Sequence, residues 1–162
     1  MEIKNIEAQD YPQVAAIYSA GIATGMATFQ TEATSWEEWD KSHLKDCRIV
    51  VFENGQMAGW AALTPVSNRC VYAGVAEVSI YIAESFRGKG IGKLLLLQLI
   101  DESEKIGLWT LQSGIFSENI ASIKLHEYCG FRVIGTREKI GKKDGVWKDN
   151  TIMERRSKTV GV

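Results

Sequence analysis

A short segment with three glycines and three cations lies near the middle of the chain, from Arg87 to Lys93 (RGKGIGK). It follows a strand-like run and precedes a run of leucines. Glycine lets a backbone approach a ligand closely, and the free N–H groups of a first helical turn attract anions. The segment therefore predicts a phosphate-binding site at the start of a helix. On this segment alone, the alternative is a glycine-rich turn with solvated cations.

Single positions exclude the two common nucleotide loops that such a segment could form. A P-loop requires glycine where Arg87 stands and serine or threonine where Leu94 stands. A dinucleotide-binding fingerprint based on Gly88 and Gly90 requires a third glycine where Lys93 stands. The expected anion therefore belongs to another kind of ligand.

A carboxylate precedes the glycine segment, on the strand expected at residues 75–82. Alternation of side chains divides this strand into two faces. One face carries Ala76, Val78, Ile80 and Ile82, and the other carries Val75, Glu77, Ser79 and Tyr81. A glutamate on a half-exposed strand is usually solvated, but the neighbours of Glu77 do not form a plainly water-facing surface. Glu77 is therefore a candidate general base.

The elements that position these groups begin with two helices. Asp10 as N-cap and Gln13 at the capping-box position predict a helix over about residues 10–20. Ser35 and Glu38 repeat the capping-box pattern and predict the start of a second helix.

Strands and two further helices complete the expected order. Asn54–Gly55 between two apolar runs predicts an antiparallel hairpin. The segment Leu94–Lys105 is too long and too polar at its end for a strand, so it predicts a helix. The remaining elements are a strand at 108–116, a helix capped by Ser117 and ended by Gly130, and a closing strand pair within 131–156. The order is strand, two helices, three strands, helix, strand, helix, two strands.

The composition is that of an ordinary globular protein with one domain, residues 1–162. Hydrophobic residues make up 45% of the chain, charged residues 24%, and the net charge is −1, so no general attraction to nucleic acid or anionic lipid is expected. Three widely spaced cysteines indicate reduced thiols rather than a disulfide framework or a metal site. The first ten residues do not resemble a secretory signal, and we expect a cytoplasmic protein.

The pattern Arg-x-x-Gly-x-Gly from Arg87, between a strand and an apolar helix, resembles the pyrophosphate-binding motif of GCN5-related N-acetyltransferases (GNAT). The segment Asn119–Phe131 is similar to the second signature of that family, in which an asparagine holds the pantetheine arm of coenzyme A. The resemblance covers nearly the whole chain in element order. It implies an α/β (α+β) fold, with a central mixed twisted sheet of about seven strands flanked by about four helices. The implied acetyl-CoA contacts are Ile80, Tyr81, Ile82, Arg87, Gly88, Lys89, Gly90, Ile91, Gly92, Lys93, Asn119 and Ser122.

Three segments are similar to phosphinothricin acetyltransferases and to methionine sulfoximine or methionine sulfone acetyltransferases. They are Gly25–Glu32, Ala76–Ile82, and KLHEYCGF together with Gly141–Asp149. The resemblance implies acetyl-CoA-dependent acetylation of the amino group of a small amino acid or analogue, in a homodimer and without a metal. Two rival functions stay open: acetylation of a peptide N-terminus or an antibiotic amine, and a non-catalytic acyl-CoA-binding regulatory domain.

The same resemblance assigns roles at the reacting centre. Glu77 resembles the catalytic carboxylate of the family and becomes the expected general base, acting through water. His126 stands where many members of the superfamily carry a tyrosine acid, and it is expected to be an acid or a substrate-site residue, with Tyr128 as a second candidate. A backbone N–H between Ile80 and Ile82 is expected to meet the developing oxyanion. The expected walls of the substrate pocket are Phe29, Tyr72 and Trp147.

Overall fold

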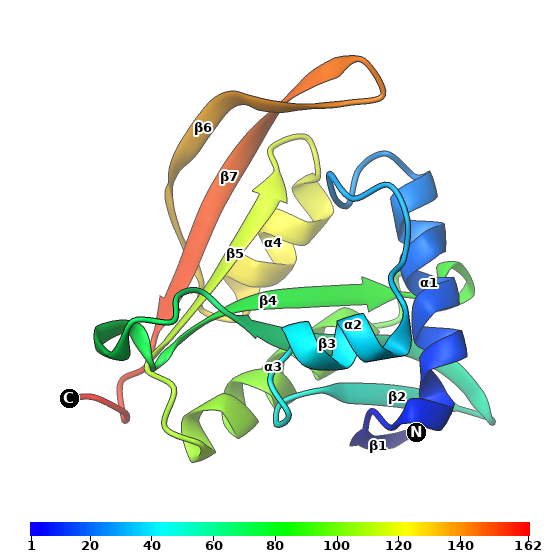
Figure 1. The fold of residues 1–162 in the computed structure, drawn as a ribbon, viewed down its shortest axis with the longest axis horizontal. Coiled ribbons are helices and arrows are strands. Elements are labelled where there is room, and N and C mark those ends of the chain that lie inside the picture. The colour runs from blue at the N-terminus through cyan, green and yellow to red at the C-terminus, as the bar shows by residue number, and fades with distance from the viewer.

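Seven strands form one mixed sheet, in the order β1-β2-β3-β4-β5-β7-β6, in a computed structural model that describes residues 1–162. The strands are β1 (Glu2–Asn5), β2 (Ile49–Glu53), β3 (Gln56–Pro65), β4 (Val75–Ile82), β5 (Thr110–Phe116), β6 (Arg132–Lys143) and β7 (Val146–Arg156). The helices are α1 (Tyr11–Ala23), α2 (Trp36–Ser42), α3 (Ile91–Lys105) and α4 (Ile120–Tyr128), with short 3-10 turns at Ala8–Asp10, Cys70–Tyr72 and Glu84–Phe86. The predicted order of strands and helices is confirmed, as is the mixed α/β class (Figure 1).

All neighbouring strands pair antiparallel except β4 and β5, which are parallel and are joined through α3. A parallel pair requires such a crossover connection. The parallel pairing is short, because it joins only Val75–Glu77 to Thr110–Gln112. Beyond these residues the two strands separate, which leaves an opening in the middle of the sheet (Figure 1).

Helices cover both faces of the sheet and give two hydrophobic cores. The larger core lies between the sheet and α3, and includes Ala76 and Val78 of β4 together with Leu95 and Leu99 of α3. The smaller core lies under α1 and α2 and contains an aromatic group that includes Trp39 and Trp60. The two faces predicted for residues 75–82 are therefore confirmed, since the even-numbered residues face the larger core and Tyr81 packs against the smaller one.

Of the three predicted helix caps, one is confirmed and two are wrong. The Ser35 hydroxyl accepts a hydrogen bond from the Glu38 N–H at 3.2 Å, as predicted. The Asp10 carboxylate instead accepts from the Glu7 N–H, because a 3-10 turn precedes α1, so the capping box with Gln13 was wrong.

The cap of α4 is Asn119, two residues later than the predicted Ser117. Its side-chain oxygen accepts from the Ser122 N–H at 3.3 Å. The Ser117 hydroxyl is engaged elsewhere, 2.7 Å from the hydroxyl of Thr151 on β7.

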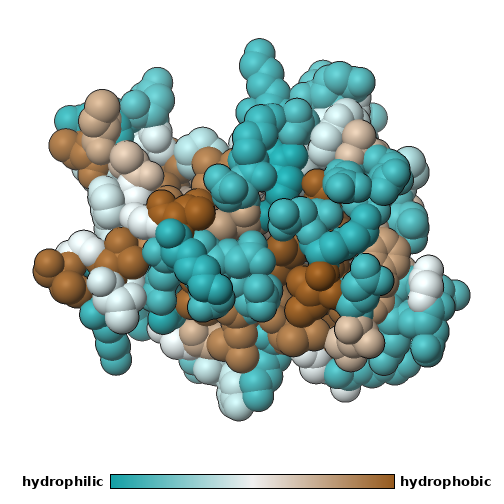
Figure 2. All heavy atoms as spheres, turned by 90° about the horizontal axis from the view of Figure 1, so that it is seen from below, coloured by the Kyte–Doolittle hydropathy of each residue, from teal (hydrophilic) through white to brown (hydrophobic).

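The β6-β7 hairpin extends away from the rest of the sheet and leaves β6 as an edge strand (Figure 1). Figure 2, seen from below Figure 1, shows hydrophilic side chains over most of that face, with hydrophobic areas separated between them. None of the four helices is long and apolar enough to cross a membrane.

Candidate active site

A cavity of about 740 Å³ occupies the opening between β4 and β5. Its wall contains residues of β4, the glycine segment, the first turn of α3, β5, α4 and the loop after α1. One cavity therefore joins the predicted anion site to the predicted general base.

The glycine segment has the geometry of an anion-binding loop. Gly88 and Gly90 have φ angles of 74° and 81°, in the left-handed region that favours glycine. Gly90 is the N-cap of α3 and supplies no side chain to bond the first-turn N–H groups, and the first backbone bond of the helix runs from the Leu94 N–H to the Gly90 carbonyl at 3.1 Å. The N–H groups of Ile91, Gly92 and Lys93 are therefore free for a ligand at the positive end of the helix dipole.

The glycine segment contains three cations, and two of them line the cavity. Arg87 and Lys93 are wall residues, and Lys93 Nζ lies 2.7 Å from the hydroxyl of Tyr128 on α4. Lys89 lies over the ring of Phe86, 5.2 Å from its centroid, and is not part of the wall. The structure thus places Arg87 and Lys93 in the cavity wall, whereas Lys89 lies over Phe86 and is not one of the lining residues.

The backbone of β4 presents unpaired groups to the opening. The Val75 carbonyl and the Ala83 N–H both form hydrogen bonds on the β3 side, so the backbone N–H and C=O groups of the odd-numbered residues point toward that strand. The backbone groups of the even-numbered residues point toward β5, but pairing with β5 ends at Glu77. Ile80 and Ile82 therefore offer N–H groups without a strand partner to the cavity, whereas the Tyr81 backbone pairs with Trp60 of β3.

Glu77 lies in the cavity wall at the last paired residue of β4, opposite Gln112 of β5. Its side chain is half-buried, and none of the seven ion pairs of the chain includes it. A carboxylate with no cation bound to it, within reach of a cavity, is free to accept a proton from a ligand or a water molecule.

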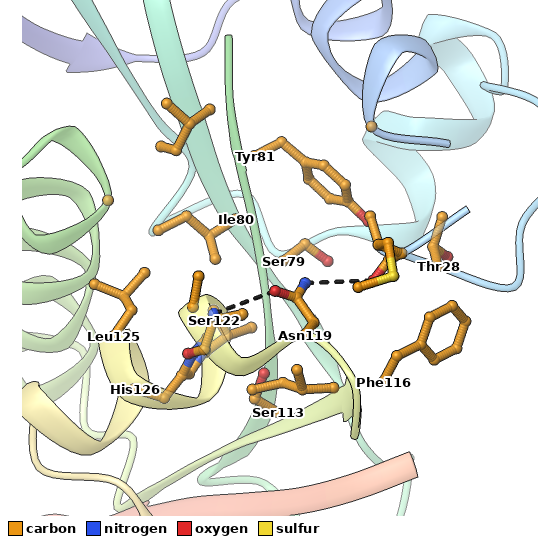
Figure 3. A pocket seen from close by; sticks show the side chains of 18 of the residues that line it. Thr28, Ser79, Ile80, Tyr81, Ser113, Phe116, Asn119, Ser122, Leu125 and His126 are labelled. Carbon is orange, nitrogen blue, oxygen red and sulfur yellow. Dashed lines mark hydrogen bonds between the residues drawn. The ribbon is translucent and has the colours of Figure 1, made fainter. Parts of the chain in front are cut away.

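Asn119 and Ser122 line the cavity from the start of α4. Figure 3 shows the Asn119 side chain between α4 and the loop after α1, with hydrogen bonds in both directions. Its oxygen accepts from the Ser122 N–H, and its nitrogen donates to the Met26 carbonyl at 3.3 Å. One N–H of the Asn119 amide is left for a ligand.

His126 is almost completely buried in α4 and is one of the residues that line the cavity. Its Nδ1 lies 2.7 Å from the Ser122 carbonyl oxygen, so Nδ1 carries the proton, because a carbonyl only accepts. Nε2 is buried and has no hydrogen-bond partner. Burial lowers the pKa of His126 below its ordinary value, against a smaller opposing effect of the Ser122 carbonyl. The neutral ring therefore presents a lone pair at Nε2, which makes it an acceptor.

The expected substrate residues divide into two groups. Phe29 lines the cavity, and its ring packs edge-on against Phe116 with 4.7 Å between centroids. Tyr72 is exposed and lies under Arg69, and Trp147 lines a separate hollow of about 300 Å³ on the hairpin. In the single chain, only Phe29 reaches the main cavity, and the roles given to Tyr72 and Trp147 stay predictions.

Several wall residues were not expected from the sequence, among them Thr28, Ser113 and Asn150. For Ser113 a signal was present, since it shares one face of its strand with Leu111 and Ile115, and a serine on an otherwise apolar face is unusual. Asn150 comes from β7, and its amide lies against Gly114 of β5, a contact that exists only once these strands pair.

Comparison with protein families matches residues 3–131 to the acetyltransferase (GNAT) family. A Bacillus subtilis protein, YwnH, assigned as a phosphinothricin acetyltransferase, is 36% identical over 160 residues, which cover 96% of this chain and 98% of that protein. The L-methionine sulfoximine/L-methionine sulfone acetyltransferase of Pseudomonas aeruginosa is 30% identical over 158 residues, 94% of this chain and 92% of its own.

Solved structures of acetyltransferases are also similar to this chain. The structure of yncA from Salmonella typhimurium, named as an acetyltransferase and containing acetyl-CoA, has a TM-score of 0.88 and 30% identity, covering 96% of this chain and 93% of its own. A ribosomal-protein-alanine N-acetyltransferase from Brucella melitensis has a TM-score of 0.89 and 30% identity, covering 97% of this chain and 100% of its own.

Proposed function

This chain belongs to the acetyltransferase (GNAT) family, and we propose that it moves the acetyl group of acetyl-CoA to the amino group of a small amino acid or analogue. Phosphinothricin, methionine sulfoximine and methionine sulfone represent the proposed substrate type, which the names of the two relatives support. The observation that carries the proposal is the single cavity that joins the free first-turn N–H groups of α3 to the unpaired carboxylate of Glu77.

The glycine end of the cavity fits the pyrophosphate of coenzyme A. A Cβ added at Gly88 or Gly90 would meet no atom within 4 Å, so open space surrounds the loop. Arg87 and Lys93 supply positive charge beside the free N–H groups. The remaining N–H of Asn119 and the free N–H groups of Ile80 and Ile82 suit the amide-rich pantetheine arm and the acetyl carbonyl.

Glu77 serves as general base in this mechanism. An alkylammonium with a pKa of about 10.4 costs roughly 4 to 5 kcal/mol to deprotonate at pH 7. Glu77 accepts this proton through a water molecule, and the freed nitrogen lone pair forms a bond to the acetyl carbon. A free N–H of β4, at Ile80 or Ile82, stabilises the oxyanion, and the carbon–sulfur bond then breaks.

His126 acts as a substrate-site acceptor rather than as an acid in this proposal. Its Nε2 has a lone pair and no partner, and its lowered pKa opposes the second proton that an acid would need. The leaving thiolate needs little acid assistance, because the pKa of a thiol lies only about 1.5 units above neutrality. Tyr128 lies outside the cavity wall, bound to Lys93.

A peptide N-terminus is the second candidate substrate. The support is the likeness to the ribosomal-protein-alanine N-acetyltransferase, which is as similar in sequence as the acetyl-CoA-bound neighbour. The rest of such a peptide would extend out of the cavity along an open groove, whereas a free amino acid would lie wholly inside the cavity.

The family resemblance also underlies the proposal of a cytoplasmic homodimer. Exposed apolar side chains on the edge strand β6, Val133, Ile134 and Ile140, are a suitable surface for a second copy. Light scattering coupled to size-exclusion chromatography tests it, and a mass of about 18 kDa, that of one chain, would contradict it.

The function is tested by measuring thiol release from acetyl-CoA with a panel of amines. The panel contains methionine sulfone, methionine sulfoximine, phosphinothricin, natural amino acids, an alanine-terminated peptide, polyamines and an aminoglycoside. We expect release with at least one of the first three. Release only with the peptide would support the second candidate, and binding of acetyl-CoA without release for any amine would indicate a non-catalytic regulatory domain.

A further inference from the structure

The loop between α1 and α2 carries one wall of the cavity but has no regular structure to hold it. We call residues 26–34 the wall loop. Met26, Ala27, Thr28 and Phe29 line the cavity. Residues 26–34 make no hydrogen bond between backbone groups, either within the loop or to another element. Side chains from elsewhere must therefore determine where this wall lies.

Three side chains from distant parts of the chain donate hydrogen bonds to carbonyl oxygens of the wall loop. Asn119 Nδ2 donates to the Met26 carbonyl at 3.3 Å, at the start of the wall loop (Figure 3). Lys143 Nζ donates to the Gln30 carbonyl at 2.7 Å, and the Tyr11 hydroxyl donates to the Thr34 carbonyl at 2.6 Å. The middle contact comes from β6, so the hairpin holds the centre of the wall loop.

Lys143 is an unusual lysine. It is only 6% exposed, and none of the ion pairs of the chain includes it. Burying an ammonium group is costly unless polar partners compensate for the lost water. The one protein acceptor that it has is the Gln30 carbonyl, so its buried charge is directed at the wall loop.

The residue beside this contact is Phe29, the wall residue that packs on Phe116. On β6, Gly141 and Lys143 share one face of the strand, because side chains two residues apart point the same way. A Cβ at Gly141 would lie 3.0 Å from the Phe29 ring, so the β6 backbone contacts that ring directly. Lys142, between them, points the other way, with its ammonium 5.0 Å from the Trp147 ring centroid.

We propose that Lys143 is a positioning residue for the amine substrate: by holding the Gln30 carbonyl, it fixes Phe29 in the cavity wall. The inference rests on the proposed acetyltransferase function, because it assigns the wall loop to amine binding. Asn119, which holds the Met26 end of the loop, also borders the predicted pantetheine site, and Tyr11 holds the Thr34 end, beyond the residues that line the cavity. Lys143 is therefore the anchor next to Phe29.

Steady-state kinetics separate positioning from general stability. Lys143→Met removes the donor and keeps an apolar stem, and Lys142→Met makes the same change on the exposed neighbouring position. We expect Lys143→Met to raise the KM for the amine about tenfold while the KM for acetyl-CoA changes by less than about twofold. Lys143→Arg, which keeps a donor, should restore most of the loss. Equal amine KM values for the Lys143→Met and Lys142→Met proteins would overturn the proposal.

A second measurement needs no activity, so it separates failure of this inference from failure of the proposed function. Chymotrypsin cleavage between Phe29 and Gln30, followed by mass spectrometry, reports how firmly the wall loop is held. We expect faster cleavage in Lys143→Met than in Lys142→Met, at unchanged thermal stability of the rest of the domain. Equal cleavage would overturn the anchoring role, and faster cleavage with an unchanged amine KM would overturn its link to the substrate. Lys143→Gln, which is too short to reach, replaces Lys143→Met if that variant does not fold.

Discussion

The two ends of the cavity are built by different means. At the glycine end, the binding groups are backbone N–H groups of β4 and of the first turn of α3, held by helix and sheet hydrogen bonds. At the wall-loop end, the backbone has no such bonds, and single side chains of α1, α4 and β6 hold it. A site for a constant cofactor can thus be part of the fold itself, whereas a wall held by a few side chains can change with few substitutions.

The largest effect is expected where the two ends meet, at Glu77. Glu77→Gln removes the proton acceptor with little change in size, so we expect kcat/KM to fall about 10² to 10⁴-fold. Acetyl-CoA binding, measured by calorimetry, should be unchanged, because Glu77 belongs to neither binding end. Full activity of this variant would refute the assignment of the base.

The glycine end should be sensitive to backbone conformation. Gly90→Ala puts a side chain at a φ of 81°, where strain of about 1 to 2 kcal/mol is expected. The first turn of α3 would shift, and we expect the KM for acetyl-CoA to rise about tenfold with little change in the amine KM. Gly135→Ala is the matched control, since Gly135 has no positive φ and open space around its Cα. Similar kinetics for both variants would contradict the difference between the two ends.

The wall-loop end should be sensitive to side-chain size instead. Phe29→Ala removes the ring that packs on Phe116, and we expect the amine KM to rise by about threefold to tenfold, with the acetyl-CoA KM unchanged. Phe52→Ala, on β2 and away from the cavity, controls for the loss of an aromatic ring. If Phe29→Ala changed the acetyl-CoA KM as much as the amine KM, the two ends would not be independent.

The smallest effect concerns the pH dependence of stability. Burial lowers the pKa of His126, so the unfolded chain binds more protons than the folded one as the pH falls below about 6.5. The free energy of unfolding should therefore decrease as the pH falls from 7.5 to 5.5. His126→Asn should reduce this decrease, measured as the free energy of unfolding in urea at the two pH values.

His43→Asn is the control for that measurement, because burial also lowers the pKa of His43, which stacks on Trp39 of the smaller core and does not line the cavity. It should reduce the pH dependence and leave acetyl transfer unchanged, whereas His126→Asn should affect both. An unaltered pH dependence in His126→Asn would contradict a lowered pKa of His126 in the folded protein.

Local rules predicted most of the fold and part of the site. Alternation in 75–82 placed Glu77 and Tyr81 on one face, and Asn54–Gly55 marked the β2-β3 turn, because both signals depend on neighbouring residues only. The start of α4 was misplaced because Ser117 and Asn119 are both good caps, and the contact of Ser117 with Thr151 on β7 decided between them.

What the sequence by itself determined is the glycine end and the position of Glu77 beside it. The order of the elements and the positions of Gly88, Gly90 and Glu77 depend on short-range periodicity and on residues that tolerate particular backbone angles. The tertiary structure alone decided the other end: that Phe29 reaches the cavity while Tyr72 and Trp147 do not in the single chain, and that Lys143 binds a carbonyl 113 residues away. Contacts of this range depend on how strands pair and separate, and no local pattern records them.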